Sequence, residues 1–497
     1  MLEKTSYAAA AWSDAHLAKL DDDEVDRFLA NPSAYFDFST TNMFGLTREL
    51  FTALQLAGLK RRFGQFRGSL PMLDKLGDSQ GVTTIAALDD VLPLLFSHEI
   101  YKSYPASLLE KRKFTQMTAW LNKLTTVDLS GVDVSGCKTI DDWMLTLETQ
   151  SPMSICHTSG TSGTISFLPT TKAEWRNRVA QYPVIFFQDF GEDAGAEPLV
   201  KTLPLNIPCI FPYFRSGGLS FTVANHALVY VIAGSEELFF AAYPGRLSAD
   251  LLLLAAKLRA AQQRGTLDQV EIDPDMLDRR KEFEASQRDM PAHLAEFFDV
   301  MRTKLAGQRI FMQASTVMLF SMAQDGLKRG IKGNFAADSV IMCGGGAKGT
   351  VLPDDWHVAV KAFFGVDRIH VNYGMSEIAG QFTECEQGNY HGVPWIISYV
   401  LDPETKQPLP RHGVTTGQFA CYDLLADSHW GGFITGDEVT MDWDGQCGCG
   451  RTTPFLHNRF RRLSEIKKDD GGEEKITCAA TPQAYSDALD FLNGDVA

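Results

Sequence analysis

The sequence predicts an α/β fold in which helices pack on parallel or mixed β-sheets. Short apolar segments of strand length alternate with longer segments in which apolar residues recur at helical spacing. Glycine-rich turns follow several of the short segments, and in α/β sheets ligands bind at the carboxyl ends of strands. The chain has 497 residues, of which 44% are hydrophobic, so we expect a large core and more than one subdomain.

The acidic composition restricts the partners of the protein. A net charge of −16 argues against nucleic acid or an anionic membrane as the main partner, because either requires a basic face. The longest aliphatic run, residues 251–256, is too short to span a bilayer, and the acidic N-terminus does not resemble a secretory signal. Nine scattered cysteines indicate reduced thiols or a metal site rather than disulfides. We therefore expect a cytoplasmic protein without a membrane span.

Residues 1–150 are predicted to be mainly helical. Apolar residues recur at helical spacing over residues 50–59 and 88–95, and residues 141–145 favour one more helix. No catalytic or ligand-binding pattern is visible in this region, which we expect to form the helical first part of a large domain.

A segment rich in glycine and hydroxyl side chains follows at residues 158–164, which read Thr-Ser-Gly-Thr-Ser-Gly-Thr. Glycine lets backbone N–H groups turn toward an anion, and Ser and Thr hydroxyls add donors. The segment lacks the Gly-Lys-Ser/Thr ending of a Walker loop. A phosphate-binding turn and an ordinary solvated loop are both compatible with this composition. Thr171-Lys-Ala-Glu174 then predicts the capped start of a helix.

Strand and helix signals alternate between residues 203 and 342. Residues 203–214 are apolar and aromatic and lead into Arg215-Ser-Gly-Gly218, where two glycines permit either close approach of a ligand or a tight turn in the core. Apolar patterns predict a strand over 227–233, a helix over 249–263 that ends near Gly265, a helix over 314–327 and a strand over 339–342.

Two further turns carry carboxylates. Residues 369–377 read as a strand leading into Tyr-Gly-Met-Ser-Glu, in which the aromatic ring could stack on a base and Glu377 could hold magnesium beside phosphates. Residues 433–437, Phe-Ile-Thr-Gly-Asp, predict a strand followed by a turn that presents Asp437. A carboxylate there suits a pair of sugar hydroxyls.

Four segments, at residues 158–164, 344–347, 373–377 and 435–437, together resemble the signatures of the adenylate-forming superfamily, which includes acyl- and aryl-CoA ligases. The turn Asp402–Thr405 and the segment Cys447–Arg451 are most similar to the phenylacetate–CoA ligase and acyl-protein synthetase branch. The resemblance implies a large multi-subdomain N-terminal domain, with the helical part at 1–150, an adenylation core at 151–460 and a short C-terminal tail at 461–497.

The resemblance also implies the roles of individual residues. Thr158, Glu377 and Arg459 are the expected catalytic residues, with Glu377 holding Mg²⁺ and with Asp437 and Arg459 holding the ribose of ATP. The expected ATP-binding residues are Thr158, Ser159, Gly160, Thr161, Ser162, Gly163, Thr164, Gly345, Gly346, Ala347, Asn372, Tyr373, Gly374, Met375, Ser376, Asp437 and Arg459.

The acid substrate needs an apolar pocket with a few polar groups. Candidate lining residues are Tyr213, Phe214, Ser216, Gly217, Gly218 and His226. A structural role for His226 is the alternative, since a lone histidine is more often structural.

The sequence departs from the superfamily pattern at two places. Ile165 and Ser166 stand where many relatives have Pro-Lys, so a cation for the leaving pyrophosphate is missing or comes from elsewhere, with Lys172 as one candidate. Arg461 and Arg462 occupy the hinge where relatives carry an acid, and the sequence then continues only to Ala497. We expect this tail to form about one strand and one helix, the helix over 481–492. We expect most of the small C-terminal domain to be absent. Lys475 could replace the lysine of that domain or be an ordinary surface residue beside two glutamates.

Cys385-x5-His391 and Cys447-x-Cys449 could form a structural zinc site. Three thiolates and one imidazole make a closed tetrahedral ligand set if the fold brings the two pairs together. Some phenylacetate–CoA ligase relatives look similar in carrying this pairing. The alternative is two unrelated pairs whose cysteines act as small hydrophobic residues.

The favoured function is ATP-dependent activation of a carboxylic acid to an acyl adenylate, with release of pyrophosphate and transfer of the acyl group to a thiol such as CoA. The acceptor could instead be a protein thiol or an amine. A protein that binds nucleotide but has lost turnover and acts as a scaffold is the alternative from another class.

Overall fold

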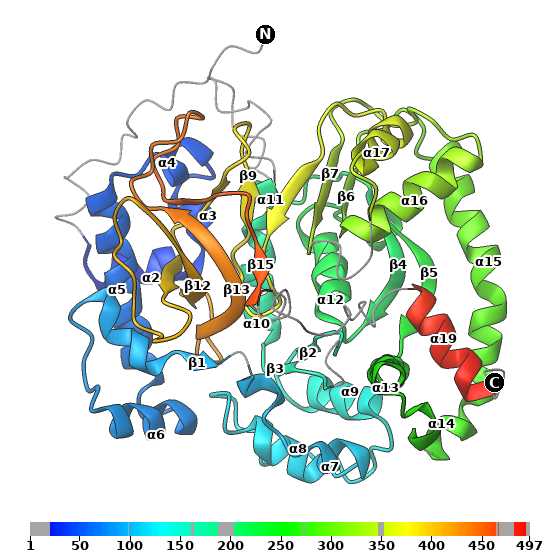
Figure 1. The fold of residues 1–497 in the computed structure, drawn as a ribbon, viewed down its shortest axis with the longest axis horizontal. Helices are drawn as coiled ribbons and strands as arrows, with labels where there is room; N and C mark the ends of the chain where they lie inside the picture. The colour runs from blue at the N-terminus through cyan, green and yellow to red at the C-terminus, as the bar shows by residue number, and fades with distance from the viewer. Residues whose placement is uncertain are drawn as a thin grey trace.

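The computed structural model describes residues 20–97, 99–160, 164–186, 203–270, 272, 274–345, 352–463, 466 and 482–493. Within them, 13 strands form one large mixed sheet, and two more form a hairpin. Helices lie on both sides of the large sheet (Figure 1). The expected α/β class with a mixed sheet is confirmed.

The parallel half of the large sheet places the ends of several strands at one edge. Its strands, in spatial order, are β5 (Phe239–Leu247), β4 (Cys209–Gly217), β6 (Phe311–Ser315), β7 (Val340–Gly344) and β8 (His370–Tyr373). All neighbouring pairs among these five strands are parallel. Their carboxyl ends therefore meet at one edge of the sheet, which is where α/β folds bind ligands.

The antiparallel half continues from β8. Its strands, in spatial order, are β9 (Phe382–Glu384), β10 (Tyr390–His391), β14 (Phe455–Leu456), β13 (Gly432–Asp442), β12 (Val414–Asp423) and β11 (Ile396–Leu401). Two short strands, β1 (Phe96–Ser97) and β15 (Arg461–Arg462), also pair with β13. The hairpin consists of β2 (Cys156–His157) and β3 (Phe167–Leu168).

The N-terminal helices pack against strands from the other end of the described chain (Figure 1). They are α2 (Asp22–Ala30), α3 (Pro32–Tyr35), α4 (Thr40–Phe44), α5 (Arg48–Phe66) and α6 (Pro71–Gln80). The buried Gln55 amide of α5 donates to the carbonyls of Pro394 and Ile396, at 3.1 and 3.0 Å. Arg62 Nε donates to the Leu424 carbonyl at 2.8 Å. These long-range bonds fix the helical N-terminal part on the antiparallel half of the sheet.

A second group of helices has its own small core. It contains α7 (Ala106–Glu110), α8 (Phe114–Leu121) and α9 (Ile140–Gln150). Trp143 is fully buried in this core, and its indole N–H donates to Thr118 Oγ1 at 2.9 Å. Ile165 and Phe167 belong to the same hydrophobic cluster. The hairpin β2–β3 is thus anchored in this helical core.

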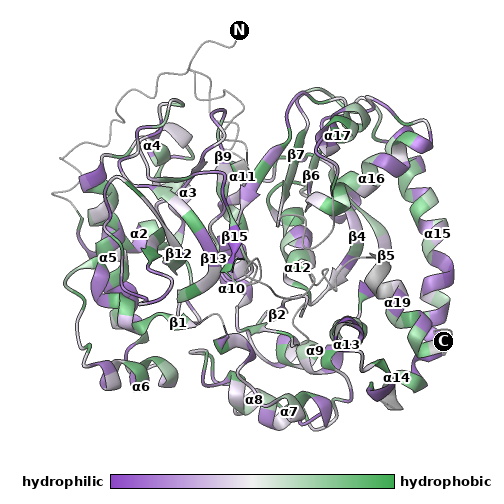
Figure 2. Ribbon diagram, viewed as in Figure 1, coloured by the Kyte–Doolittle hydropathy of each residue, from purple (hydrophilic) through white to green (hydrophobic). Residues whose placement is uncertain are grey.

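The remaining α-helices of the described residues lie between residues 172 and 493. They are α10 (Lys172–Ala180), α11 (Tyr182–Phe186), α12 (Ser220–Ala227), α13 (Ala249–Arg264), α14 (Pro274–Asp278), α15 (Arg280–Thr303), α16 (Thr316–Lys328), α17 (Trp356–Phe364) and α19 (Pro482–Asn493). Hydrophilic and hydrophobic residues alternate along α15, which lies at the edge of the molecule (Figure 2). Among the described residues, no helix combines the length and hydropathy needed to cross a bilayer.

Several predicted elements agree with the structure. The helix expected over 249–263 is α13, which ends at Gly265 in the left-handed conformation, with φ of 66°. The helix expected over 314–327 is α16, and the strand expected over 339–342 is β7. Thr171 caps α10, as predicted, by accepting a hydrogen bond from the Glu174 amide at 3.1 Å.

Two predicted elements are wrong. Residues 227–233 form the end of α12 and a 3₁₀ helix, Leu228–Tyr230, instead of a strand. A short apolar run does not distinguish a buried strand from a buried helix, and here most of the apolar residues are buried in a helical segment and in the turn that follows it. Asp437 does not lie in a turn, because β13 continues through it to Asp442.

Candidate active site

The glycine-rich segment is a loop closed at its base by two hydrogen bonds. The Thr158 amide donates to the Ser166 carbonyl at 3.0 Å, and the Ser166 amide donates to Thr158 Oγ1 at 3.1 Å. Gly160 has a φ of 64°, which favours glycine. Thr161, Ser162 and Gly163 lie outside the described residues, so the structure places the base of the expected phosphate loop but not its tip.

Ile165 anchors this loop. Its side chain is fully buried, and its carbonyl accepts a hydrogen bond from the Tyr104 hydroxyl at 2.7 Å. His157 precedes the loop and is also fully buried, with Nδ1 2.9 Å from the Thr158 carbonyl. Burial lowers the pKa of His157 to about 4, so the imidazole is neutral near pH 7 and Nδ1 donates in this bond.

The turn after β8 lies at the carboxyl edge of the parallel sheet, where the sequence predicts the nucleotide. β7 ends beside it at Gly344, and Gly345 has a φ of 75°. Gly346 and Ala347 lie outside the described residues. Asn372 is buried, and its amide donates to the Gln381 side chain. Gly374, Met375 and Ser376 follow in the half-buried turn that ends in Glu377.

Glu377 and Asp437 are the two carboxylates of this region. Burial raises the pKa of Glu377 above its ordinary value, while the positive charges of Arg462 and Arg178 oppose this shift. The Tyr373 hydroxyl donates to Asp437 Oδ2 at 3.0 Å. Burial, together with the charge of Asp437, raises the pKa of Tyr373 well above its ordinary value, so the hydroxyl stays protonated and remains a donor.

The arginine on Asp437 is Arg462 rather than Arg459. Arg462 Nε lies 3.0 Å from Asp437 Oδ1, and the β13–β15 register pairs the two residues. Arg459, the expected ribose ligand, is exposed, and its amide donates to the His457 carbonyl at 2.6 Å. Arg461 and Arg462 follow Arg459 closely in the sequence, so the sequence already offered other arginines as partners of Asp437.

Phe460 covers the ring of Tyr373. The two rings are nearly parallel, at 2°, with centroids 4.4 Å apart. Tyr390 contacts Phe460 edge-on, with centroids 5.0 Å apart. The groups expected to bind adenine and ribose, Tyr373 and Asp437, are therefore both contacted by the segment that contains β15.

The two glycines of the expected acid pocket lie where three elements meet. The His157 amide donates to the Gly218 carbonyl at 2.8 Å. A Cβ atom on Gly218 would lie 2.5 Å from Met144 Cε and 2.9 Å from His157 Cδ2, so this position has no room for a side chain. Gly217 is also closely packed, because a Cβ there would lie 2.9 Å from Leu247 Cβ.

The other expected pocket residues are not all near Gly218. Tyr213 and Phe214 are buried within β4, which continues through Ser216. His226 lies in the last turn of α12, about 9 Å along the helix from its start. Its Nε2 is 2.9 Å from Glu236 Oε1, and Arg215 pairs with the same carboxylate at 2.5 Å. These contacts give His226 a structural role in a half-exposed cluster, so its presence does not require a bound ligand.

Neither candidate lysine is placed on the loop by the structure. Lys172 Nζ donates to the Glu148 carbonyl at 2.6 Å. Lys475 lies outside the described residues.

The four predicted zinc ligands converge. The ligand atoms of Cys385, His391, Cys447 and Cys449 all lie within 4.8 Å of one another, and all four residues are buried. Cys385 follows β9 and His391 ends β10, while the other two cysteines come from the segment between β13 and β14. Sγ of Cys385 and Sγ of Cys447 are 3.8 Å apart, and Cys449 Sγ is 3.3 Å from His391 Nε2.

Neighbouring groups orient these ligands. The Asn389 amide donates to Cys447 Sγ at 3.3 Å, and the Arg451 backbone amide donates to Cys449 Sγ at 3.5 Å. His391 Nδ1 lies 3.3 Å from Thr453 Oγ1, which leaves Nε2 directed at the sulfurs. Donors to thiolates and a fixed imidazole are the outer contacts that zinc ligands require. The donor set therefore fits zinc.

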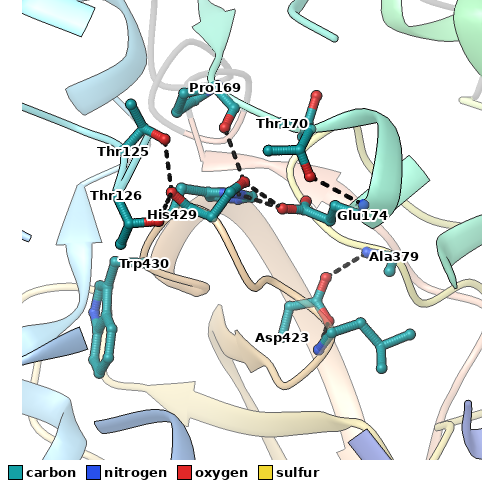
Figure 3. A network of polar contacts seen from close by, with 12 residues as sticks. Thr125, Thr126, Pro169, Thr170, Glu174, Ala379, Asp423, His429 and Trp430 are labelled. Atoms are coloured by element: carbon teal, nitrogen blue, oxygen red, sulfur yellow. Dashed lines mark hydrogen bonds and ion pairs between the residues drawn. The ribbon is translucent and has the colours of Figure 1, made fainter. Parts of the chain in front are cut away.

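A buried polar network behind the Glu377 turn was not predicted from the sequence (Figure 3). Glu174 of α10 accepts a hydrogen bond from the Ser428 hydroxyl at 2.7 Å and lies 3.3 Å from His429 Nδ1. Arg178, one turn further along α10, lies 3.4 Å from Glu174. Asp423 Oδ2 accepts from the Ala379 amide at 2.5 Å. The spacing of Glu174 and Arg178 on one helix face was the available sequence signal.

Comparison with known proteins shows a likeness in structure only. No family model matches the sequence, and no curated protein matches it. An open conformation of 2-hydroxyisobutyryl-CoA ligase, in complex with 2-HIB-AMP and CoA, is 14% identical to this chain. The match covers 91% of this chain and 92% of that chain, with a TM-score of 0.50.

Two further solved structures are similar to a smaller extent. The same ligase in the thioesterification state is 14% identical over 84% of this chain and 69% of that chain, with a TM-score of 0.47. ATP-bound MatB from Rhodopseudomonas palustris is 14% identical over 64% of this chain and 52% of that chain, with a TM-score of 0.32. Because the overlap with the open ligase extends over most of both chains, the chain has the mixed α/β fold of adenylate-forming acyl-CoA ligases.

Proposed function

We propose that this protein activates a carboxylic acid with ATP, forming an acyl adenylate and pyrophosphate, and then transfers the acyl group to a thiol such as CoA. The observation that carries the proposal is that Tyr373, which ends β8 at the carboxyl edge of the parallel sheet and leads into the turn with Glu377, donates a hydrogen bond to Asp437 of β13. The fold adds support, because the open ligase of the same fold was captured with 2-HIB-AMP and CoA.

In the proposed reaction, a substrate carboxylate oxygen attacks the α-phosphorus of ATP, and the bond to the β-phosphate oxygen breaks as pyrophosphate leaves. Catalysis of such a step consists mainly of positioning and of neutralising phosphate charge. Backbone N–H and hydroxyl groups of residues 158–164 would hold the outer phosphates. Asp437 would accept hydrogen bonds from the ribose hydroxyls, and Tyr373 would stack on adenine. Glu377 would hold magnesium, whose charge offsets that of the phosphate oxygens.

Nucleotide binding in this arrangement requires the β15 segment to move. Phe460 lies on the face of Tyr373, and Arg462 occupies one oxygen of Asp437. Both contacts have to be exchanged for contacts with adenine and ribose.

We also propose that Cys385, His391, Cys447 and Cys449 bind one structural zinc ion. Four protein ligands form a closed set that leaves no coordination position for a substrate. Zinc there would tie the turn between β9 and β10 to the segment between β13 and β14, close to the base of β15.

The test of the proposed function is exchange of labelled pyrophosphate into ATP in the presence of a panel of carboxylic acids. We expect exchange that depends on an added acid, and we expect Glu377→Gln and Asp437→Asn to reduce it at least tenfold. The absence of exchange with every acid in the wild type would overturn the proposal.

A nucleotide-binding scaffold without turnover is the second candidate. It is favoured by one observation: Lys172, a candidate cation for the leaving pyrophosphate, donates to the Glu148 carbonyl instead. Binding of ATP without acid-dependent exchange would support this candidate.

A further inference from the structure

We propose that Arg178 and Asp423 are positioning residues for Glu377, which hold the two ends of the turn that carries it. The inference rests on the proposed function, in which Glu377 binds magnesium beside the phosphates of ATP. Neither residue is expected to touch the nucleotide. Both act through the backbone of residues 376–379.

Hydrogen bonds to the turn come from both sides of Glu377. Arg178 Nη1 donates to the carbonyl of Ser376, the residue before Glu377, at 3.1 Å. Asp423 Oδ2 accepts from the amide of Ala379, two residues after Glu377, at 2.5 Å. The Ser376 hydroxyl also lies 2.6 Å from the Ser220 hydroxyl, at the start of α12. The backbone on each side of Glu377 is thus fixed by a charged side chain.

The elements that carry the two charged groups are rigid. Arg178 lies over the ring of Trp175 at 4.8 Å and 3.4 Å from Glu174 on the same helix. The second oxygen of Asp423 accepts from the Leu425 amide at 2.9 Å. Glu174 is held in turn by Ser428 and His429 (Figure 3). The turn is therefore fastened to α10 on one side and to the end of β12 on the other.

A purely structural role does not explain why the two buried side chains, Arg178 and Asp423, are charged. Arg178 is 2% exposed and Asp423 is fully buried, and a buried charge is costly unless it is paired and hydrogen-bonded. Neutral side chains could satisfy one carbonyl and one amide without that cost. Charged groups at these positions are explained if the turn must hold Glu377 in one fixed orientation.

The experiment compares Arg178→Gln, Arg178→Lys and Asp423→Asn with the wild type. Calorimetry measures the binding of ATP at a series of Mg²⁺ concentrations, and pyrophosphate exchange is followed over the same series. We expect the Mg²⁺ concentration for half-maximal binding to rise roughly tenfold or more in Arg178→Gln and Asp423→Asn, as for other residues that orient metal ligands. Arg178→Lys retains the charge and should recover part of the loss, and it provides a second test if Arg178→Gln does not fold.

Arg112→Gln is the matched control. Arg112 also forms a buried ion pair, 2.6 Å from Asp250, with side chains that are 15% and 0% exposed. It lies between α7 and α8, in the helical group that packs around α9 and α13. Arg112→Gln should lower the melting temperature but leave the Mg²⁺ dependence unchanged.

The outcomes separate the inference from the proposed function. If the wild type binds ATP with Mg²⁺ and the Arg178 and Asp423 variants keep the wild-type Mg²⁺ dependence, the positioning role is overturned while the proposed function stands. If the wild type shows neither Mg²⁺-dependent ATP binding nor exchange, the proposed function is overturned and the inference with it.

Discussion

Glu174 is a buried carboxylate surrounded by groups that favour its ionised form. It is 1% exposed. Burial by itself raises the pKa of its carboxyl group, but His429, Arg178 and the Ser428 hydroxyl together lower it to about 2. Burial, together with the nearby charge of Glu174, raises the pKa of Asp427 to about 6. The net effect is a carboxylate that contributes to stability only while it is ionised.

The pH dependence of this contribution can be measured. Because the pKa of Glu174 is lower in the folded protein than the ordinary value of about 4.3, its contribution is complete above about pH 5 and is lost as pH falls toward 2. Glu174→Gln should be less stable by about 3 to 5 kcal/mol at pH 7, since it leaves Arg178 and His429 without their carboxylate. The difference in melting temperature between wild type and variant should shrink between pH 5 and pH 3. A difference that stays constant over this range would contradict the assignment.

The cysteine cluster gives the second prediction at the scale of single residues. Cys447→Ser removes one of four ligands, so purified variant protein should contain less than half an equivalent of zinc and melt at a lower temperature than the wild type. Elemental analysis and a thermal melt measure both effects. Cys137→Ser is the control, because Cys137 is half-buried and lies outside the cluster. Wild-type protein with less than about half an equivalent of zinc would refute the zinc site.

At the scale of elements, the short strand β15 decides access to the candidate nucleotide site. It pairs with β13 through Asp437↔Arg462 and Glu438↔Arg461. The residue before it, Phe460, stacks on Tyr373. One small element thus covers both the expected base-stacking ring and the expected ribose carboxylate.

Removal of the stacked ring tests this role. A stacked aromatic pair contributes about 0.5 to 1.5 kcal/mol, so Phe460→Ala should bind ATP about 2- to 10-fold more tightly than the wild type in calorimetry. Arg461→Ala is the control on the same element, because Arg461 pairs with Glu438 and contacts neither Tyr373 nor Asp437 in the described residues. Weaker ATP binding by Phe460→Ala would show instead that Phe460 contributes to the nucleotide site.

At the scale of the whole molecule, the N-terminal helices and the C-terminal strands form one packed unit. The Gln55 amide of α5 supplies the hydrogen bonds for two buried carbonyls, at Pro394 and Ile396. Their separation in the sequence exceeds 300 residues. The helical region is therefore part of the body that supports β11 and β12.

Substitution of this residue should destabilise the protein as a whole. Gln55→Leu leaves two buried carbonyls without donors, at a cost of about 1 to 3 kcal/mol for each group. We expect a clearly lower melting temperature, with loss of helical and sheet signals in the same transition. Gln80→Leu, at an exposed position on α6, should leave the melting temperature nearly unchanged. A selective loss of helical signal in Gln55→Leu would show that the two parts unfold separately.

Local chemistry explains which features were predictable. Thr171 and Gly265 cap helices through bonds to residues within a few positions, so their roles follow from the neighbouring sequence. The mixed α/β class follows from alternating apolar periods, and the Cys and His spacings identified the four residues that converge in the cluster. The prediction of a strand at 227–233 was wrong because the periodicity of so short an apolar run does not distinguish a buried strand from a buried helix.

Local sequence patterns were sufficient to predict the α/β class, two of the helix caps and the four residues of the cysteine and histidine cluster. The contacts between distant residues became visible in the folded chain: Arg462 at Asp437, Phe460 on Tyr373, and Arg178 at the Ser376 carbonyl, 198 positions away in the chain. The physical reason is that these contacts depend on strand register and on the packing of distant elements. Local propensity and spacing contain no information about either.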